Sequence, residues 1–155
     1  MSNSAWSCLP MAFSKALNIP FEKMIEYIGH DGSASVYKNS KYRRGFHFQE
    51  CIDVALKLKV ACVPIEHHYA LTPDGLETYQ IGDNNTQSKR FIEYLTNTEV
   101  GVLEGLALDK DQVPIGHAAT WMNQHILDPR GLEYQYDVRH LHNFCVIRLW
   151  RFIWF

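Results

Sequence analysis

Apolar positions in the first 60 residues recur at helical spacing and predict three helices. These cover residues 8–17, 21–28 and 48–58. Ser7 is a residue type that caps helix starts, so we expect it to be the N-cap of the first helix. Gly29 is typical of the position just past a helix end and closes the second. The N-terminal half of the chain is therefore predicted to be mainly helical.

From residue 60 onward the apolar positions indicate strands. We expect one short helix at residues 87–95 and strands at residues 60–66, 100–108, 115–121, 125–128 and 146–154. Pro64 has no backbone donor, which favours an edge position for the first strand. The aromatic last strand is expected to close the sheet and to enter the core. Helices in one half and strands in the other are typical of an α+β fold, here as one domain spanning residues 1–155.

Composition and charge narrow the possible partners. The chain has 155 residues, 46% hydrophobic and 21% charged, which fits one folded domain. Its net charge of −2 argues against a nucleic-acid partner, and the basic residues between 38 and 44 are interpreted as a solvated loop. Apolar runs are too short for a membrane helix, which needs roughly 20 residues. We therefore expect a cytoplasmic protein without a membrane partner.

Cysteine usage leaves room for a reactive thiol. The four cysteines are far apart and form no CxxC pair, so free thiols are expected in a reducing compartment: Cys8, Cys51, Cys62 and Cys145. Cys8 opens the first predicted helix, where partial positive charge and free amide groups favour a thiolate. Cys51 and Cys62 lie on apolar faces and are interpreted as core residues.

A histidine and an acid follow Cys8 far downstream in the chain. His117 lies in one predicted strand, and Asp128 ends the next. If residues 122 and 123 form a two-residue turn, His117 stands directly opposite Asp128, with Cβ atoms roughly 4.5–5.5 Å apart. The carboxylate then orients the imidazole, and the imidazole serves the thiol. A slip of one residue would send the two side chains to opposite faces.

The layout of the chain resembles the papain-like cysteine peptidase fold. It has a cysteine at a helix start, a helical first half, a strand led by a histidine, and then an acid followed by turn residues. The most specific part is His117-Ala118, Trp121 and the run from Asp128 to Gly131. The layout is similar to small peptidase domains that process bacteriocin leaders and to peptidase-like proteins of tailed bacteriophages. The resemblance implies that Cys8 is the nucleophile, His117 the general base and acid, and Asp128 the orienting acid.

The segment before Cys8 departs from the papain-like pattern. Papain-like enzymes usually carry a Gln six residues before the cysteine, and its amide helps to form the oxyanion hole. Here that position is Ser2, and the neighbouring Asn3 is the candidate donor, although from a shorter side chain near the chain end. Trp6 either packs on the first helix or flanks the substrate groove.

These residues predict a thiol hydrolase of the peptidase, isopeptidase or amidase type, acting on a protein or peptide without any cofactor. Two alternatives stay open. One is a catalytically silent papain-like protein that binds a host or partner protein, and the other is transglutaminase-like acyl transfer. No zinc-type spacing is present. His140 and His142 are interpreted as a polar strand edge rather than as metal ligands.

Overall fold

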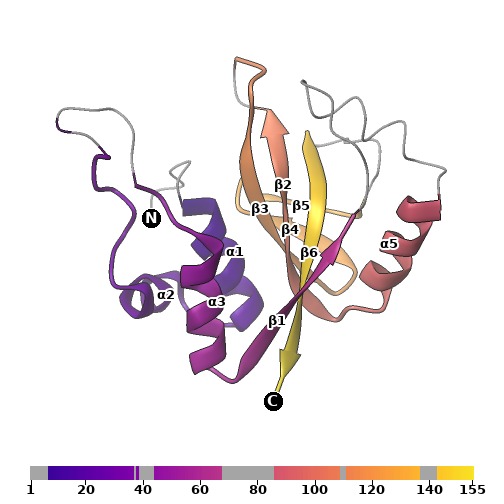
Figure 1. Cartoon of the computed structure of the whole chain (residues 1–155), viewed down its shortest axis with the longest axis horizontal. Helices are drawn as coiled ribbons and strands as arrows, with labels where there is room; N and C mark the ends of the chain where they lie inside the picture. Colours follow the sequence, from indigo (N-terminus) through magenta and orange to yellow (C-terminus); the bar gives the residue numbers. More distant parts are fainter. Residues whose placement is uncertain (1–6, 37, 39–43, 68–85, 109–110, 137–142) are drawn as a thin grey trace.

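The computed structural model of the chain describes residues 7–36, 38, 44–67, 86–108, 111–136 and 143–155. Within these ranges, six strands form one antiparallel sheet in the order β1-β6-β2-β3-β4-β5 (Figure 1). The strands are β1 (Val60–Glu66), β2 (Val100–Leu108), β3 (Pro114–Met122), β4 (His125–Asp128), β5 (Leu132–Tyr134) and β6 (Phe144–Trp154). The helices are α1 (Cys8–Leu17), α2 (Phe21–Ile28), α3 (Phe48–Lys57) and α5 (Thr86–Thr96). The predicted α+β class is confirmed.

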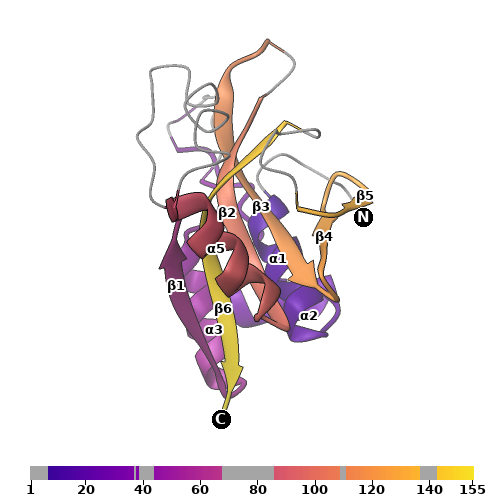
Figure 2. The same cartoon turned by 90° about the vertical axis from the view of Figure 1, so that its right-hand side faces the viewer.

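The sheet separates two apolar layers. Helices α1, α2 and α3 cover one face and α5 covers the other, as the two views at right angles show (Figures 1 and 2). Side chains that alternate along β2 divide between the layers: Val102 packs with the α1–α3 cluster and Leu103 with the α5 cluster. Ala118 and Ala119 divide in the same way on β3. Both faces of the sheet are therefore buried in apolar clusters.

The termini of the helices follow from local residue types. Gly29 ends α2 in the left-handed conformation at φ 94°, as predicted. Asn18 ends α1 in the same conformation at φ 58°. Ser7 occupies the N-cap position of α1, as predicted, although its side chain makes no capping hydrogen bond. Its hydroxyl instead lies 3.8 Å from the Met11 sulfur.

Two expectations about the sheet change. The edge position of β1 is confirmed. The last strand, β6, does not close the sheet but lies inside it between β1 and β2. Its final residue, Trp154, and the following Phe155 are exposed rather than core. The short strand β5 was not predicted, because three residues with a mostly exposed pattern carry little periodic signal. No helix within the described ranges is long and apolar enough to cross a membrane.

Candidate active site

Cys8 is the first residue of α1 and is half-buried. The first-turn N–H groups of a helix have no partner inside the helix and carry the positive end of its dipole. The Ser7 side chain makes no capping hydrogen bond, so it does not occupy the first-turn N–H groups of α1. An anion that develops on or beside the Cys8 sulfur therefore lies in a favourable field.

His117 lies on β3 and is 8% exposed. Its Nε2 atom is 3.0 Å from Oδ1 of Asp128. Phe144 of β6 packs edge-on against the imidazole, with ring centroids 4.9 Å apart and an interplanar angle of 88°. An ionised carboxylate can only accept hydrogen bonds, so Nε2 carries the proton and Nδ1 is the nitrogen left for the Cys8 thiol.

The hairpin that carries His117 and Asp128 has a different register from the predicted one. Asn123 and Gln124 form the turn, both with positive φ, and Thr120 stands opposite Leu127. The predicted direct opposition of His117 and Asp128 was therefore wrong. In the observed register they are diagonal neighbours, roughly 7–8 Å apart at the backbone. The displacement is two residues, which preserves the face of the sheet, and the long imidazole spans the diagonal.

The Asp128 side chain is fully buried and heavily bonded. In addition to His117, it accepts hydrogen bonds from the backbone N–H of Arg130 at 2.9 Å, from Nε and Nη2 of Arg130 at 2.9 and 2.6 Å, and from the Tyr134 hydroxyl at 2.8 Å. Within the described residues, five hydrogen bonds thus hold one carboxylate. Arg130 and Tyr134 were not predicted to serve the site. The only sequence signal was an arginine two residues after the acid in a turn.

Two opposite pKa displacements follow from this arrangement. Burial alone would lower the pKa of His117, but hydrogen bonds to Asp128 and Cys8, together with their negative charges, raise it above its usual value. Burial alone would raise the pKa of Asp128, but hydrogen bonds from His117 and Arg130 hold it well below the usual range. The arrangement therefore favours the ionised form of Asp128 and favours a proton on the imidazole.

A buried hydrogen bond joins the helix that carries Cys8 to the strand that carries His117. The Thr120 hydroxyl on β3 donates a 2.7 Å hydrogen bond to the Ala12 carbonyl in the middle of α1. Thr120 is 1% exposed, so this bond lies in the interior. It fixes α1, and with it Cys8, relative to the strand of His117.

The other three cysteines lie in environments that suppress ionisation or are closed to solvent. Burial raises the pKa of the Cys62 thiol to about 12, and burial likewise raises that of Cys51. Cys145 is buried. Cys62 is half-buried like Cys8, which makes it an internal reference for thiol reactivity.

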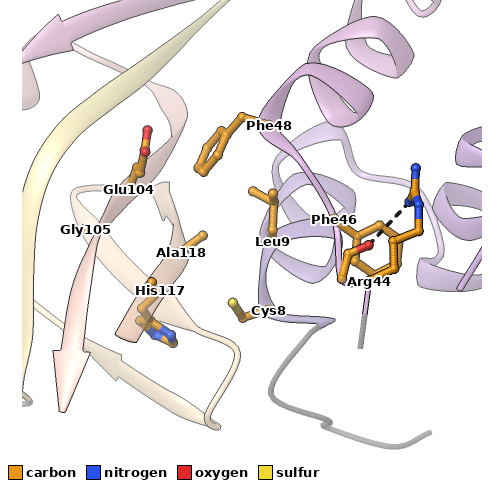
Figure 3. Close-up of a pocket in the computed structure, with 11 residues that line it drawn as sticks. Cys8, Leu9, Arg44, Phe46, Phe48, Glu104, Gly105, His117 and Ala118 are labelled. Atoms are coloured by element: carbon orange, nitrogen blue, oxygen red, sulfur yellow. Dashed lines mark hydrogen bonds between the residues drawn. The ribbon is translucent and has the colours of Figure 1, made fainter. Parts of the chain in front are cut away.

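A cavity of about 270 Å³ adjoins Cys8 and His117 (Figure 3). It lies between the helical side, with α1 and the segment leading into α3, and the sheet side, with β2 and β3. Its lining is Cys8, Leu9, Arg44, Gly45, Phe46, Phe48, Glu104, Gly105, Gly116, His117 and Ala118. Cys8 and His117 thus border one open space between the helical side and the sheet.

Several predicted site residues fall beyond what the structure describes. Asn3 and Trp6, the candidates for the oxyanion hole and the substrate groove, lie outside the described residues, as do His140 and His142. Among the residues that are described, no group of three or more His, Cys, Asp or Glu side chains could hold a metal ion.

Searches of protein-family models, curated proteins and solved structures for similarity to this chain found no significant match.

Proposed function

We propose that this chain is a papain-like thiol hydrolase that cleaves a peptide, isopeptide or other amide bond. Cys8 is the nucleophile, His117 the general base and acid, and Asp128 the group that orients His117. The observation that carries the proposal is the 3.0 Å hydrogen bond between His117 and the buried Asp128, made where His117 lines the same cavity as Cys8 at the start of α1.

The reaction follows from these positions. The Cys8 proton passes to His117, and the sulfur attacks the substrate carbonyl carbon. The first-turn N–H groups of α1 stabilise the oxyanion, and His117 gives its proton to the departing amine as the C–N bond breaks. A water then attacks the thioester and loses a proton to His117. Release of the acid returns that proton to the Cys8 sulfur.

The first test is alkylation with iodoacetamide at neutral pH, followed by mass mapping of each cysteine. We expect Cys8 to react at least about tenfold faster than Cys62, since burial holds the Cys62 thiol un-ionised. The substitution His117→Ala should slow Cys8 and leave Cys62 unchanged. His125→Ala, on the same hairpin but bonded to the Asn123 carbonyl, is the matched control. Equal rates for Cys8 and Cys62 would contradict the activated thiol.

The second test separates hydrolysis from the other possible uses of the site. A proteome-derived peptide mixture is incubated with the protein and with its Cys8→Ser variant, and new peptide termini are identified by mass spectrometry. Termini that depend on Cys8 support hydrolysis. Amine adducts formed on addition of a primary amine indicate acyl transfer. A labelled thiol without any product would favour a catalytically silent binding protein.

A further inference from the structure

The cavity beside Cys8 and His117 is small and mostly apolar. Its volume of about 270 Å³ lies just below the roughly 300–1,000 Å³ of sites that enclose whole small ligands, so it suits a single side chain of a larger substrate. The apolar walls come from both sides of the site: Leu9, Phe46, Phe48 and Ala118. The cavity is open beside Gly116, because a Cβ placed there would meet nothing within 4 Å.

Besides Cys8 and His117, two charged side chains line this cavity, Arg44 and Glu104. They differ in how far an ion-pair partner neutralises their charge. The Arg44 guanidinium is 2.7 Å from the Glu50 carboxylate and also contacts His30, so its charge is neutralised locally. Glu104 has no such exclusive partner, because it shares Arg148 with Glu66.

Among the ion pairs of the described residues, the shared guanidinium leaves one negative charge in excess. Arg148 donates to Oε1 of Glu104 at 2.6 Å and to Oε1 of Glu66 at 2.5 Å, so two carboxylates face one cation. The Trp150 indole also donates to Oε1 of Glu104, at 2.8 Å. The other carboxylate oxygen of Glu104, Oε2, accepts no hydrogen bond from the described residues.

The pairing of β2 with β3 places Glu104 close to His117 along the sheet. It stands opposite Ala118 on the neighbouring strand, one residue beyond His117. In Figure 3, Glu104 and Phe48 lie at one end of the view of the cavity, and Cys8 and His117 at the other. A side chain that enters beside Cys8 therefore passes apolar walls before it reaches the carboxylate.

We propose that this cavity is a specificity pocket for a basic residue of the substrate, lysine or arginine, whose cationic head pairs with Glu104. The methylene stem covers Leu9 and Phe48 while the head donates to the carboxylate, an arrangement that long basic side chains adopt readily. A purely apolar side chain would remove water from Glu104 without replacing its hydrogen bonds. The inference rests on the proposed function, since it takes Cys8 as the point of bond cleavage.

The test uses peptidyl acyloxymethyl ketones, which alkylate an active thiol. Matched probes carry lysine, norleucine or glutamate at each of the three residues nearest the reactive group. Norleucine keeps the apolar stem and lacks the ammonium group. We expect the lysine probe to label Cys8 about tenfold faster than the norleucine probe at one of the three positions, which is the scale of one charged hydrogen bond.

Substitutions assign that preference to Glu104. In Glu104→Gln, the lysine-to-norleucine ratio should fall to near one, and in Glu104→Lys the glutamate probe should become the better one. Because each ratio is taken within one variant, a partial folding defect cancels. Glu26→Gln is the matched control: it makes the same chemical change at an exposed carboxylate that neither lines the cavity nor meets Arg148, so the lysine preference should persist.

The outcomes distinguish the two proposals. Labelling of Cys8 without a lysine preference, or a preference that survives Glu104→Gln, overturns the specificity pocket and leaves the hydrolase intact. If no probe labels Cys8 faster than Cys62, the proposed chemistry fails. In that case, equilibrium binding of the same peptides as amides to the Cys8→Ser variant decides the pocket: a lysine preference that depends on Glu104 supports it, and equal binding overturns it.

Discussion

The two sides of the cavity are built in different ways. On the sheet side, His117 and Asp128 sit in hydrogen-bonded strands, and the carboxylate is held by His117, Arg130 and Tyr134 together. On the helical side, Cys8 depends on the placement of one helix start. The side chains of His117 and Asp128 are therefore fixed by several hydrogen bonds, whereas the position of Cys8 depends on few. Substitutions on the sheet side should therefore cost folding stability, and those on the helical side should mainly alter reactivity.

The largest expected effect is that of Asp128→Ala. Removing the carboxylate leaves His117, Arg130 and Tyr134 without a shared acceptor, and breaking a buried ion pair by deleting one partner costs about 3–5 kcal/mol. Urea denaturation measures the loss in unfolding free energy. The control is Asp53→Asn, whose exposed carboxylate accepts a bond from Gln49 and should change stability by less than about 0.5 kcal/mol. A loss below about 1 kcal/mol for Asp128→Ala would contradict the redundant clamp.

Gly105→Ala should be the next largest, again on the sheet side. A Cβ at this position would lie 1.9 Å from the Cys145 carbonyl oxygen, where the pairing of β2 with β6 shifts register. Backbone must move to relieve the clash, and overpacking typically costs about 1–3 kcal/mol. Gly116→Ala is the matched change in the same cavity lining, and its Cβ meets nothing within 4 Å. Thermal unfolding of the two variants should therefore separate them clearly, and similar melting temperatures would contradict the close approach of the strands.

Most elements of the fold could be predicted because their signals are local. The periodicity and end residues of α1 and α2 and the edge proline of β1 lie within the elements themselves. The hairpin register could not be predicted, because either Met122-Asn123 or Asn123-Gln124 satisfies the pattern of alternating residues. Only the observed pairing shows that Asn123 and Gln124 adopt the positive φ.

The sequence predicted that Cys8, His117 and Asp128 belong to one candidate site, but it did not predict the residues that hold Asp128 in place. Cys8, His117 and Asp128 carry recognisable chemistry in a recognisable order. Arg130 and Tyr134 meet the carboxylate only because β4 and β5 fold back on each other. The acid of the cavity, Glu104, is likewise placed by pairing of β2 with β3 and β6, which no local pattern encodes.

A smaller effect is expected on the helical side from Glu50→Gln. Burial would raise the pKa of Glu50, but the His47 backbone N–H, Arg44 and His30 outweigh it and lower the pKa to about 2. These bonds hold the cavity segment that contains Arg44 against the start of α3. Since the folded-state pKa is depressed, the stability from Glu50 is present above about pH 4.5 and is lost as the pH falls toward 2.

Unfolding free energies from pH 2 to 6 check this contribution. The difference between the protein and Glu50→Gln should be about 1 kcal/mol at pH 6, since the pair is partly exposed, and should shrink toward zero at pH 2. Glu26→Gln is the control, because Glu26 is exposed and meets Lys23 only at 3.5 Å. A difference that stays constant with pH would mean that the carboxylate charge does not hold this segment.

Thr120→Val should lose no more stability than Glu50→Gln, and it tests the comparison most directly. Valine keeps the shape of threonine and removes only the hydroxyl that binds Ala12 at 2.7 Å, at a cost of about 1 kcal/mol. Thr98→Val is a close match, since Thr98 is equally buried and bonds the Tyr94 carbonyl at 2.8 Å, but it does not join α1 to β3. The two variants should lose similar stability. If α1 is held in place by few bonds, iodoacetamide labelling of Cys8 should slow severalfold in Thr120→Val alone. Equal labelling in both variants would mean that the packing of α1 against the sheet is sufficient to align the thiol with His117, and the two sides of the cavity would then be equally fixed.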